Sequence, residues 1–343
     1  MGEVKSAEVY FEKRLKNRRP GTQKIYRTYL GEFLVFAGLS IEGLYDTHWR
    51  GLSSGDPREG SEVTQLVADW LHYLEEEKGF ADGTIWNYLK AIRFFFKANK
   101  LPFELDLEDL PSKTYSGQRA ISKEQVRLLH DYVGEEFRER NRAMIMMGKD
   151  LGFRISDICK LQHSHCETAT RILDDEGMTF LRMVPIKTIK KGYFADPHIG
   201  PEAVKAMDAF IEVRGTHAGP LFEKRGGGEL GRKGGSAIFL RLASKLPGGG
   251  FGVSAHSFRK YHNTQLEGAG MNTNWIKSLQ GKSHYEYSDP QGLTITEKYI
   301  ECYPHLRVFD DVYRIDKLEY KYEGVLKTLQ TLQREIIAAN RLR

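Results

Sequence analysis

Residues 151–157 of this chain are Leu-Gly-Phe-Arg-Ile-Ser-Asp, and two later stretches, His256-Ser-Phe-Arg259 and Thr296-Glu-Lys-Tyr299, complement them. Together they supply two arginines, a histidine and a tyrosine, without a set of residues spaced as metal ligands. Arginine side chains can hold the non-bridging oxygens of a phosphodiester while a phenol attacks phosphorus in line. The combination predicts phosphodiester chemistry by a protein nucleophile, with no requirement for ATP or Mg²⁺.

These stretches resemble the motifs of the tyrosine recombinases, the family of phage-type integrases, Xer and Cre, and in particular its archaeal integrases. The family's first arginine lies in a pattern close to Gly-Leu-Arg-Ile-Ser-Glu; here it is Arg154, with Asp157 as the acidic residue that steadies the site. His256 and Arg259 match the family's His-x-x-Arg, and Tyr299 matches the tyrosine of its Thr-x-x-Tyr. The match covers nearly the whole chain, and the motifs follow the family's order.

The family also has a catalytic lysine on the turn after a strand. Residues 178–184 are predicted to form such a strand, and a lysine-rich turn follows them. Its lysines are Lys187, Lys190 and Lys191, and spacing alone does not choose among them. The Lys-Thr dipeptide that the family carries at this position favours Lys187.

One position departs from the family's pattern. The family usually has Gly-His or Gly-Trp shortly before the nucleophile, whereas Gly281 is followed here by Lys282. The stretch from Lys282 to Tyr299 is also longer than the family's spacing, and its turn residues predict an inserted loop. Either Lys282 or the nearby His284 could supply the missing donor to the phosphate, and Lys282 is our candidate.

The resemblance implies a mainly α-helical protein with a small β-sheet in its catalytic domain, folded as a two-domain clamp on double-stranded DNA. It implies site-specific recombination, in which four protomers synapse two duplexes and Tyr299 forms a 3′-phosphotyrosyl link. Arg154 and Arg259 would hold the non-bridging oxygens of the phosphate. His256 would assist there, and Lys187 would act as general acid for the 5′-oxygen. No cofactor, metal ion, small-molecule substrate or membrane is implied.

Two other functions remain open. A type IB topoisomerase uses a similar residue set but relaxes supercoils as a monomer, and the compact N-terminal helical region and heptad tail favour recombination over it. A DNA-binding accessory protein could keep the fold without catalysis, but the near-complete residue set argues against this alternative. Covalent trapping on DNA separates the accessory protein from both enzymes, and strand exchange between two duplexes separates the two enzymes.

Composition sets broader limits. A chain of 343 residues is too long for one typical domain core, and 40% hydrophobic with 28% charged residues is ordinary for a globular protein. The net charge of +5 is compatible with a polyanionic partner. Three cysteines argue against a disulfide framework and predict a reducing, cytoplasmic compartment. No apolar run is long enough to cross a bilayer, and no signal peptide is evident.

The hydrophobic pattern divides the chain into four parts. Residues 1–105 are predicted to form a helical DNA-binding domain, the core-binding domain of the resembled family. Residues 106–120 lose this period and are predicted to be the linker. Residues 121–315 are predicted to form the catalytic domain, which begins with a helix capped by Ser122. Residues 316–343 carry a heptad pattern that predicts a C-terminal helical tail. In the resembled family a segment here passes to the neighbouring subunit, and a helix docked on its own domain remains the alternative, because periodicity does not show which surface a stripe faces.

Individual elements are predicted from the same patterns. Residues 144–161 and 201–213 are each predicted to be helical. Tyr303 is a rival to Tyr299 as the nucleophile, but Pro304 follows it and disfavours helix there. The apolar helix faces of the first domain are predicted to contain Ile25, Tyr29, Phe33 and Phe36, then Leu66, Trp70 and Leu74, and then Ile85, Leu89, Ile92 and Phe96.

Two further patterns resemble binding motifs, but a structural role is favoured for each. Residues 159–166 hold two cysteines and two histidines, but their spacing fits no common zinc finger. We therefore expect a structural thiol and surface histidines there. Residues 226–231 satisfy Gly-x-Gly-x-x-Gly, but no strand-turn-helix unit is evident around them, so a surface loop is expected instead of a nucleotide site.

Overall fold

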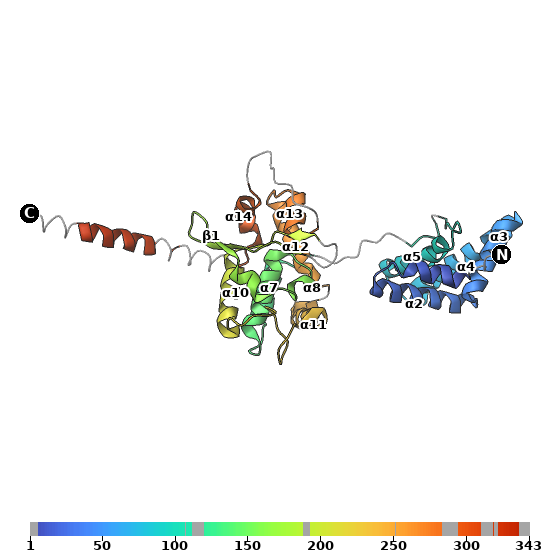
Figure 1. The fold of residues 1–343 in the computed structure, drawn as a ribbon, viewed down its shortest axis with the longest axis horizontal. Coiled ribbons are helices and arrows are strands. Elements are labelled where there is room, and N and C mark those ends of the chain that lie inside the picture. The colour runs from blue at the N-terminus through green and yellow to red at the C-terminus, as the bar shows by residue number, and fades with distance from the viewer. Residues whose placement is uncertain are drawn as a thin grey trace, which may run out of the picture. The chain divides into compact units, whose positions relative to one another are not determined.

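The computed structural model describes residues 6–106, 108–111, 120–187, 193–250, 252–282, 294–309, 318 and 322–335. Within these residues the protein is mainly helical with a small antiparallel sheet, which confirms the predicted fold class. The chain divides into two compact units, Met1–Ser116 and Gly117–Arg343, and the division falls inside the stretch that the sequence marks as a linker (Figure 1). Among the described helices, none combines the length and the apolar character that a bilayer span requires.

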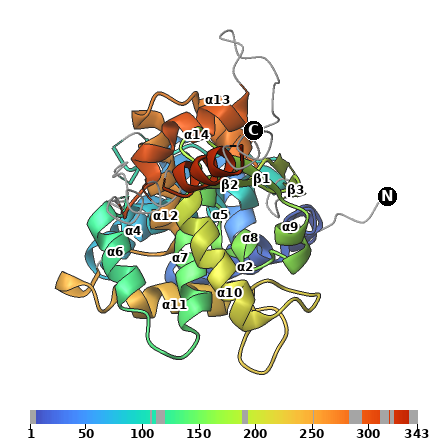
Figure 2. The same cartoon turned by 90° about the vertical axis from the view of Figure 1, so that its left-hand side faces the viewer.

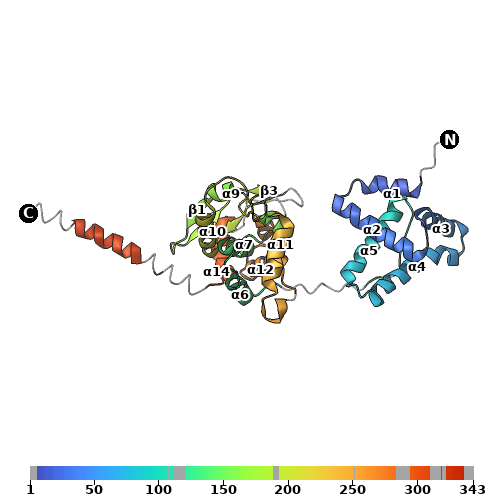
Figure 3. The same cartoon turned by 90° about the horizontal axis from the view of Figure 1, so that it is seen from below.

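The first unit is a bundle of helices (Figure 3). They are α1 (Ala7–Leu15), α2 (Pro20–Ala37), α3 (Ile41–Ser54), α4 (Pro57–Glu76) and α5 (Asp82–Ala98). Helix α5 supplies much of the core, and its predicted face of Ile85, Leu89, Ile92 and Phe96 is buried. The predicted face of α2 is wrong in part: Phe33 is buried, but Ile25 and Phe36 are largely exposed. Periodicity identifies a stripe but does not say how far a neighbouring helix covers it.

The second unit is built around one buried helix. Its helices are α6 (Lys123–Asp131), α7 (Arg138–Leu151), α8 (Ile155–Ile158), α9 (His163–Glu167), α10 (Pro201–Arg214), α11 (Gly231–Ala243), α12 (Ala255–Gly268), α13 (Thr273–Leu279) and α14 (Ile295–Leu306). Helix α7 is buried along most of its length and packs against α6, α10 and α12 (Figure 2). The predicted capping box at Ser122 is confirmed, because the Ser122 hydroxyl accepts from Gln125 N–H at the start of α6.

Short strands lie beside these helices. A three-stranded antiparallel sheet has the order β1 (Thr170–Leu173), β2 (Thr179–Arg182) and β5 (His198–Ile199). Strand β2 lies inside the predicted strand 178–184, and α10 begins at the predicted Pro201. A separate two-stranded sheet pairs β3 (Ile186–Lys187) with β4 (Phe194–Ala195). The lysine-rich turn therefore begins on a β-hairpin.

Two predictions of helix extent are wrong. Residues 144–161 do not form one helix, because α7 ends at Leu151 and Gly152 adopts a left-handed conformation with φ of +54°. Pro304 does not end α14, which continues to Leu306. The side chains of Tyr303 and Leu306 are buried in the core, and this tertiary packing outweighs the local preference of the Tyr-Pro pair.

Candidate active site

The first arginine lies where α7 gives way to α8. The left-handed Gly152 ends α7, and Arg154 follows in an extended conformation as the N-cap of α8. One turn into α8, the buried carboxylate of Asp157 approaches Arg154, with 3.7 Å between Arg154 Nη1 and Asp157 Oδ2. The break in the helix therefore gives Arg154 a position that a continuous helix would not, and Asp157 lies where it can steady the guanidinium.

The second arginine and the histidine lie on α12. Ser254 caps this helix, and His256 and Arg259 lie one turn apart on it. The Arg259 side chain is buried, and its Nη1 donates a hydrogen bond of 2.9 Å to the carbonyl oxygen of Gly152. Burial, together with the positive charge of Arg154, lowers the pKa of Arg259 to about 10. The two arginines, far apart in sequence, are therefore neighbours.

Lys282 completes this group from a third segment. Helix α13 ends at Leu279, Gly281 adopts a left-handed conformation, and the Lys282 N–H donates to the carbonyl of Lys277 at 2.7 Å. Burial, followed by the charges of Arg259 and Arg154, lowers the pKa of the Lys282 ammonium to about 8. We call Arg154, His256, Arg259 and Lys282 the cationic cluster.

His256 responds to the same charges. Burial lowers its pKa, and Arg259, Lys260, Lys282 and Arg154 lower it further. Because like charges disfavour one another, a group of this kind is costly unless an anion joins it. Within the described residues, Arg259 Nη2 is buried without a hydrogen-bond partner. The cluster therefore presents donors suited to the oxygens of a phosphodiester.

Among the described residues, no hydrogen bond joins Lys187 to the cationic cluster. This lysine is exposed on β3, opposite Phe194 of β4. Strand β4 packs against α13, which leads to Lys282, and the Asp196 N–H donates to the carbonyl of Ser278. The hairpin is thus attached to the segment that carries Lys282. Lys190, Lys191 and His284 lie outside the described residues.

Tyr299 is not brought to the cationic cluster. It lies on α14 with its ring fully buried, 5.4 Å from the ring of His198. Burial, followed by the carboxylates of Asp150 and Glu202, raises the pKa of the Tyr299 phenol well above its usual value. Among described atoms, the Tyr299 hydroxyl finds no hydrogen-bond partner. In this conformation the tyrosine is buried near carboxylates, and no described contact joins it to the cationic cluster.

Sequence reasoning missed the charged residues around Tyr299. Lys149 Nζ lies 2.5 Å from Asp150 Oδ1 and 3.0 Å from Glu202 Oε2, and all three side chains are buried. Glu202 also accepts from the backbone N–H groups of Val308 and Phe309, which follow α14. We call Lys149, Asp150 and Glu202 the Glu202 network. No local motif marks it, because its members come from two distant helices.

The analysis of motifs also missed His262 and Gln280. Gln280 Nε2 donates to His262 Nδ1 at 2.8 Å, and both side chains are fully buried. They lie between the segments that carry the cationic cluster.

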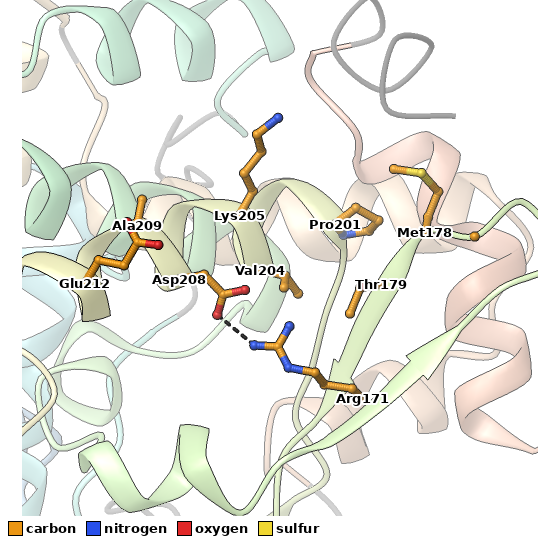
Figure 4. Close-up of a pocket in the computed structure, with 10 residues that line it drawn as sticks. Arg171, Met178, Thr179, Pro201, Val204, Lys205, Asp208, Ala209 and Glu212 are labelled. Atoms are coloured by element: carbon orange, nitrogen blue, oxygen red, sulfur yellow. Dashed lines mark hydrogen bonds and ion pairs between the residues drawn. The ribbon is translucent and has the colours of Figure 1, made fainter. Parts of the chain in front are cut away.

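Other features of the unit lie away from the cluster. The cavity of about 420 Å³ between β1, β2 and α10 is lined in part by Arg171 and Asp208, which pair with each other at 2.8 Å (Figure 4). None of the predicted site residues lines it. Cys159 is buried as a structural thiol, but the expectation of a surface histidine is wrong for His163, which is also buried because it packs under the chain near Gly219.

Three solved structures are similar to this chain in fold. The Tn1549 transposon integrase in complex with transposon right-end DNA matches 94% of this chain and 100% of its own, with a TM-score of 0.55 and 16% identity. A lambda integrase tetramer bound to a Holliday junction matches 84% of this chain and 77% of its own, with a TM-score of 0.56 and 16% identity. A lambda integrase dimer bound to a COC′ core site matches 89% and 96%, with a TM-score of 0.52 and 15% identity.

Neither a protein-family model nor a curated protein matches the sequence. The structural similarity shows that this chain has the fold of the tyrosine recombinases. At 15–16% identity this similarity shows the fold alone and assigns no chemical activity to the chain.

Proposed function

We propose that this protein is a site-specific DNA recombinase that cuts and rejoins double-stranded DNA through a 3′-phosphotyrosyl intermediate. The observation that carries the proposal is the cationic cluster: residues from three distant segments converge, and a buried arginine nitrogen, Arg259 Nη2, has no hydrogen-bond partner among the described residues. Cations that mutually disfavour their charges are stabilised by an anion, and a phosphodiester offers two non-bridging oxygens.

In the proposed reaction the Tyr299 phenol loses its proton to solvent as its oxygen attacks phosphorus, and the bond from phosphorus to the 5′-oxygen breaks. Arg154 and Arg259 hold the non-bridging oxygens, where negative charge builds in the transition state. His256 and Lys282 contact the same phosphate. Lys187 donates the proton that the leaving 5′-oxygen requires. The covalent phosphotyrosyl link conserves the energy of the broken phosphodiester bond, so religation needs no cofactor.

The burial of Tyr299 adds a requirement to this proposal. The phenol must leave its position beside Asp150 and Glu202 before its oxygen can reach a phosphate held by the arginines. An unpaired buried hydroxyl costs roughly 1–3 kcal/mol, so the buried position is not favoured by hydrogen bonding. We therefore propose that α14 shifts when DNA binds.

The wider assignments rest on the same proposal. Residues 1–105 would form the DNA-binding half of a clamp and residues 121–315 the catalytic half, joined by the linker 106–120. A tetramer on DNA would form the synapse, as the lambda integrase tetramer does on its Holliday junction. The cytoplasmic location follows from the cysteine content, and the assignment to the archaeal kind rests on the sequence resemblance alone.

Covalent trapping on DNA tests the proposal. Full-length protein incubated with duplex substrates nicked beside the scissile phosphate should form a complex that survives denaturation. Tyr299→Phe should bind the same DNA with unchanged affinity but form no such complex, because only the attacking oxygen is removed. Tyr303→Phe is the matched control and should still be trapped. A label on Tyr303 in peptide maps would overturn the assignment, and absence of any complex across substrates of natural flanking DNA would overturn the function.

The tail is proposed to serve assembly. Residues 322–335 are helical, and the described members of the heptad pattern are exposed: Leu318, Tyr322, Val325, Leu329 and Leu332. An isolated helix of this length is marginal without a partner. Deleting the residues after Ile315 should leave half-site cleavage intact and reduce strand exchange. Equal strand exchange by truncated and full-length protein at matched DNA occupancy would remove the assembly role, and relaxation of a plasmid without strand exchange would favour a type IB topoisomerase.

A further inference from the structure

Three segments that carry the cationic cluster meet at one buried point. Gly152 lies two residues before Arg154, His262 lies one turn after Arg259, and Gln280 lies two residues before Lys282. A side-chain carbon placed on Gly152 would lie 2.5 Å from Gln280 Nε2 and 2.6 Å from His262 Cγ. These distances are far below van der Waals contact, so the two side chains pack directly on the Gly152 backbone.

Hydrogen bonds join the same three segments. Gln280 Nε2 donates to His262 Nδ1 at 2.8 Å and to Asn263 Oδ1 at 2.6 Å, so the end of α13 is attached to α12. The Arg259 guanidinium attaches α12 to the carbonyl of Gly152 at 2.9 Å. The two acceptors on one amide nitrogen define the orientation of the Gln280 amide. Each cationic segment is therefore attached to another within a few residues of its functional side chain.

The hydrogen bond from Gln280 requires a neutral His262 ring. Burial, followed by the charges of Arg259 and Lys282, lowers its pKa to about 3. The ring is therefore neutral at physiological pH, and its Nδ1 can accept the hydrogen bond from Gln280. A neutral acceptor also adds no further positive charge to the cluster beside it.

We propose that His262 and Gln280 form a positioning pair, which holds the turn with Lys282 against the segments with Arg154 and Arg259 so that the cations converge on one phosphate. The inference deepens the proposed function and rests on it for the phosphate. The pair itself does not touch the substrate. Its effect on rate is geometric, because displacing a catalytic group by a small distance costs a large factor in rate.

Two substitutions remove the hydrogen bond while keeping side-chain volume. Gln280→Met keeps the length of the side chain without its amide, and His262→Phe keeps a ring without the acceptor. Ser278→Ala is the matched control, because Ser278 is also buried on α13 but its hydroxyl takes no part in the pair. His262→Asn places an amide oxygen near the Nδ1 position and should restore part of what His262→Phe loses.

The first measurement is single-turnover cleavage of saturating duplex DNA by full-length protein. We expect Gln280→Met and His262→Phe each to slow cleavage by about tenfold to a hundredfold with unchanged DNA affinity. The double variant should be little slower than either single variant, because both remove the same interaction. Ser278→Ala should cleave at the wild-type rate. A double variant whose effects multiply would overturn the pair.

The second measurement does not need DNA. The pH dependence of amine labelling at Lys282, read by peptide mass spectrometry, should have a midpoint near 8 in the wild type. In Gln280→Met and His262→Phe the midpoint should rise toward the ordinary lysine value of 10.5, because Lys282 becomes more solvated and moves away from the arginines. An unchanged midpoint in both variants would overturn the proposal. If the wild type cleaves no DNA while the midpoints shift, the recombinase function fails and the positioning role stands.

Discussion

The cationic cluster and the Glu202 network are both polar regions of the same catalytic unit, but their charges are balanced differently. In the Glu202 network, a lysine lies within 3.0 Å of two carboxylates, and backbone N–H groups of Gly200, Val308 and Phe309 donate to those carboxylates. In the cationic cluster, the neighbouring charges that shift the pKa values of Arg259 and Lys282 are mostly positive, and Asp157 is the acidic residue paired with Arg154. The network is complete without a ligand, whereas the cluster gains stability from an anion.

The largest expected effect concerns the cluster. Arg259→Ala should lower single-turnover cleavage by roughly a hundredfold to a thousandfold, as expected when one transition-state donor is removed. Arg259→Lys keeps the charge but not the planar fork, so it should recover only part of the rate. Gel quantification of covalent product at saturating DNA measures both. A rate for Arg259→Ala within threefold of wild type would place the phosphate elsewhere.

The corresponding change in the network should affect stability instead. Glu202→Gln removes one carboxylate from the buried lysine, and breaking a buried ion pair typically costs about 3–5 kcal/mol. The free energy of unfolding in urea should fall by about that amount, while Glu212→Gln, on the exposed face of α10, should change it by less than about 0.5 kcal/mol. Equal values for the two variants would contradict the structural role of the network.

Alanine variants of Lys282 and His284 test which of the two residues belongs to the cationic cluster. If Lys282 is the donor that replaces the family's histidine or tryptophan, Lys282→Ala should slow cleavage by about a hundredfold and His284→Ala should not. The opposite pattern would assign the role to His284. If neither variant is slower in single-turnover assays, the proposed alignment of this segment is wrong.

The smallest expected effect is a pH dependence of stability. The pKa of Lys282 is about 8 in the folded protein, below its usual 10.5, so the unfolded chain binds more protons between these values. The contribution of this group to the free energy of unfolding is therefore lowest below pH 8 and rises as the pH increases from 8 toward 10.5. Lys282→Met removes the lysine, so its stability advantage over wild type should shrink across that range. Urea unfolding at pH 7, 8.5 and 10 measures the difference; a constant difference would mean that the pKa of Lys282 is not lowered by burial and by the arginines.

Much of the fold was predictable because it depends on local patterns. The capping box at Ser122, the strand around Thr179 and the helix from Pro201 follow from a Ser-x-x-Gln pattern, a short, mostly apolar stretch and a Gly-Pro start. The break at Gly152 was not predicted, since a glycine inside an apolar period is compatible with a continuing helix. Glycine is required at position 152 because His262 and Gln280 occupy the space that a side chain would need.

The candidate site, like the fold, has a part that the sequence predicted and a part that it did not. Residue types and motif order were sufficient to nominate Arg154, His256, Arg259 and Lys282, because phosphodiester chemistry needs cations and the resembled family carries them in this order. Sequence also nominated Tyr299 as the nucleophile, and this remains a prediction. It contained no information on the burial of that tyrosine beside the Glu202 network, because the network joins helices that are distant along the chain.

The sequence by itself determined which chemical groups the protein has and where helices can begin and end, since capping, turn and periodicity signals act over a few residues. Only the tertiary structure decided which of those groups meet. The attachment of Gly152, His262 and Gln280 brings the segments of the cationic cluster together, and the packing of α14 buries Tyr299 beside Asp150 and Glu202. Both depend on contacts between different elements, such as the bond of Arg259 to Gly152 across 107 positions, for which no local pattern exists.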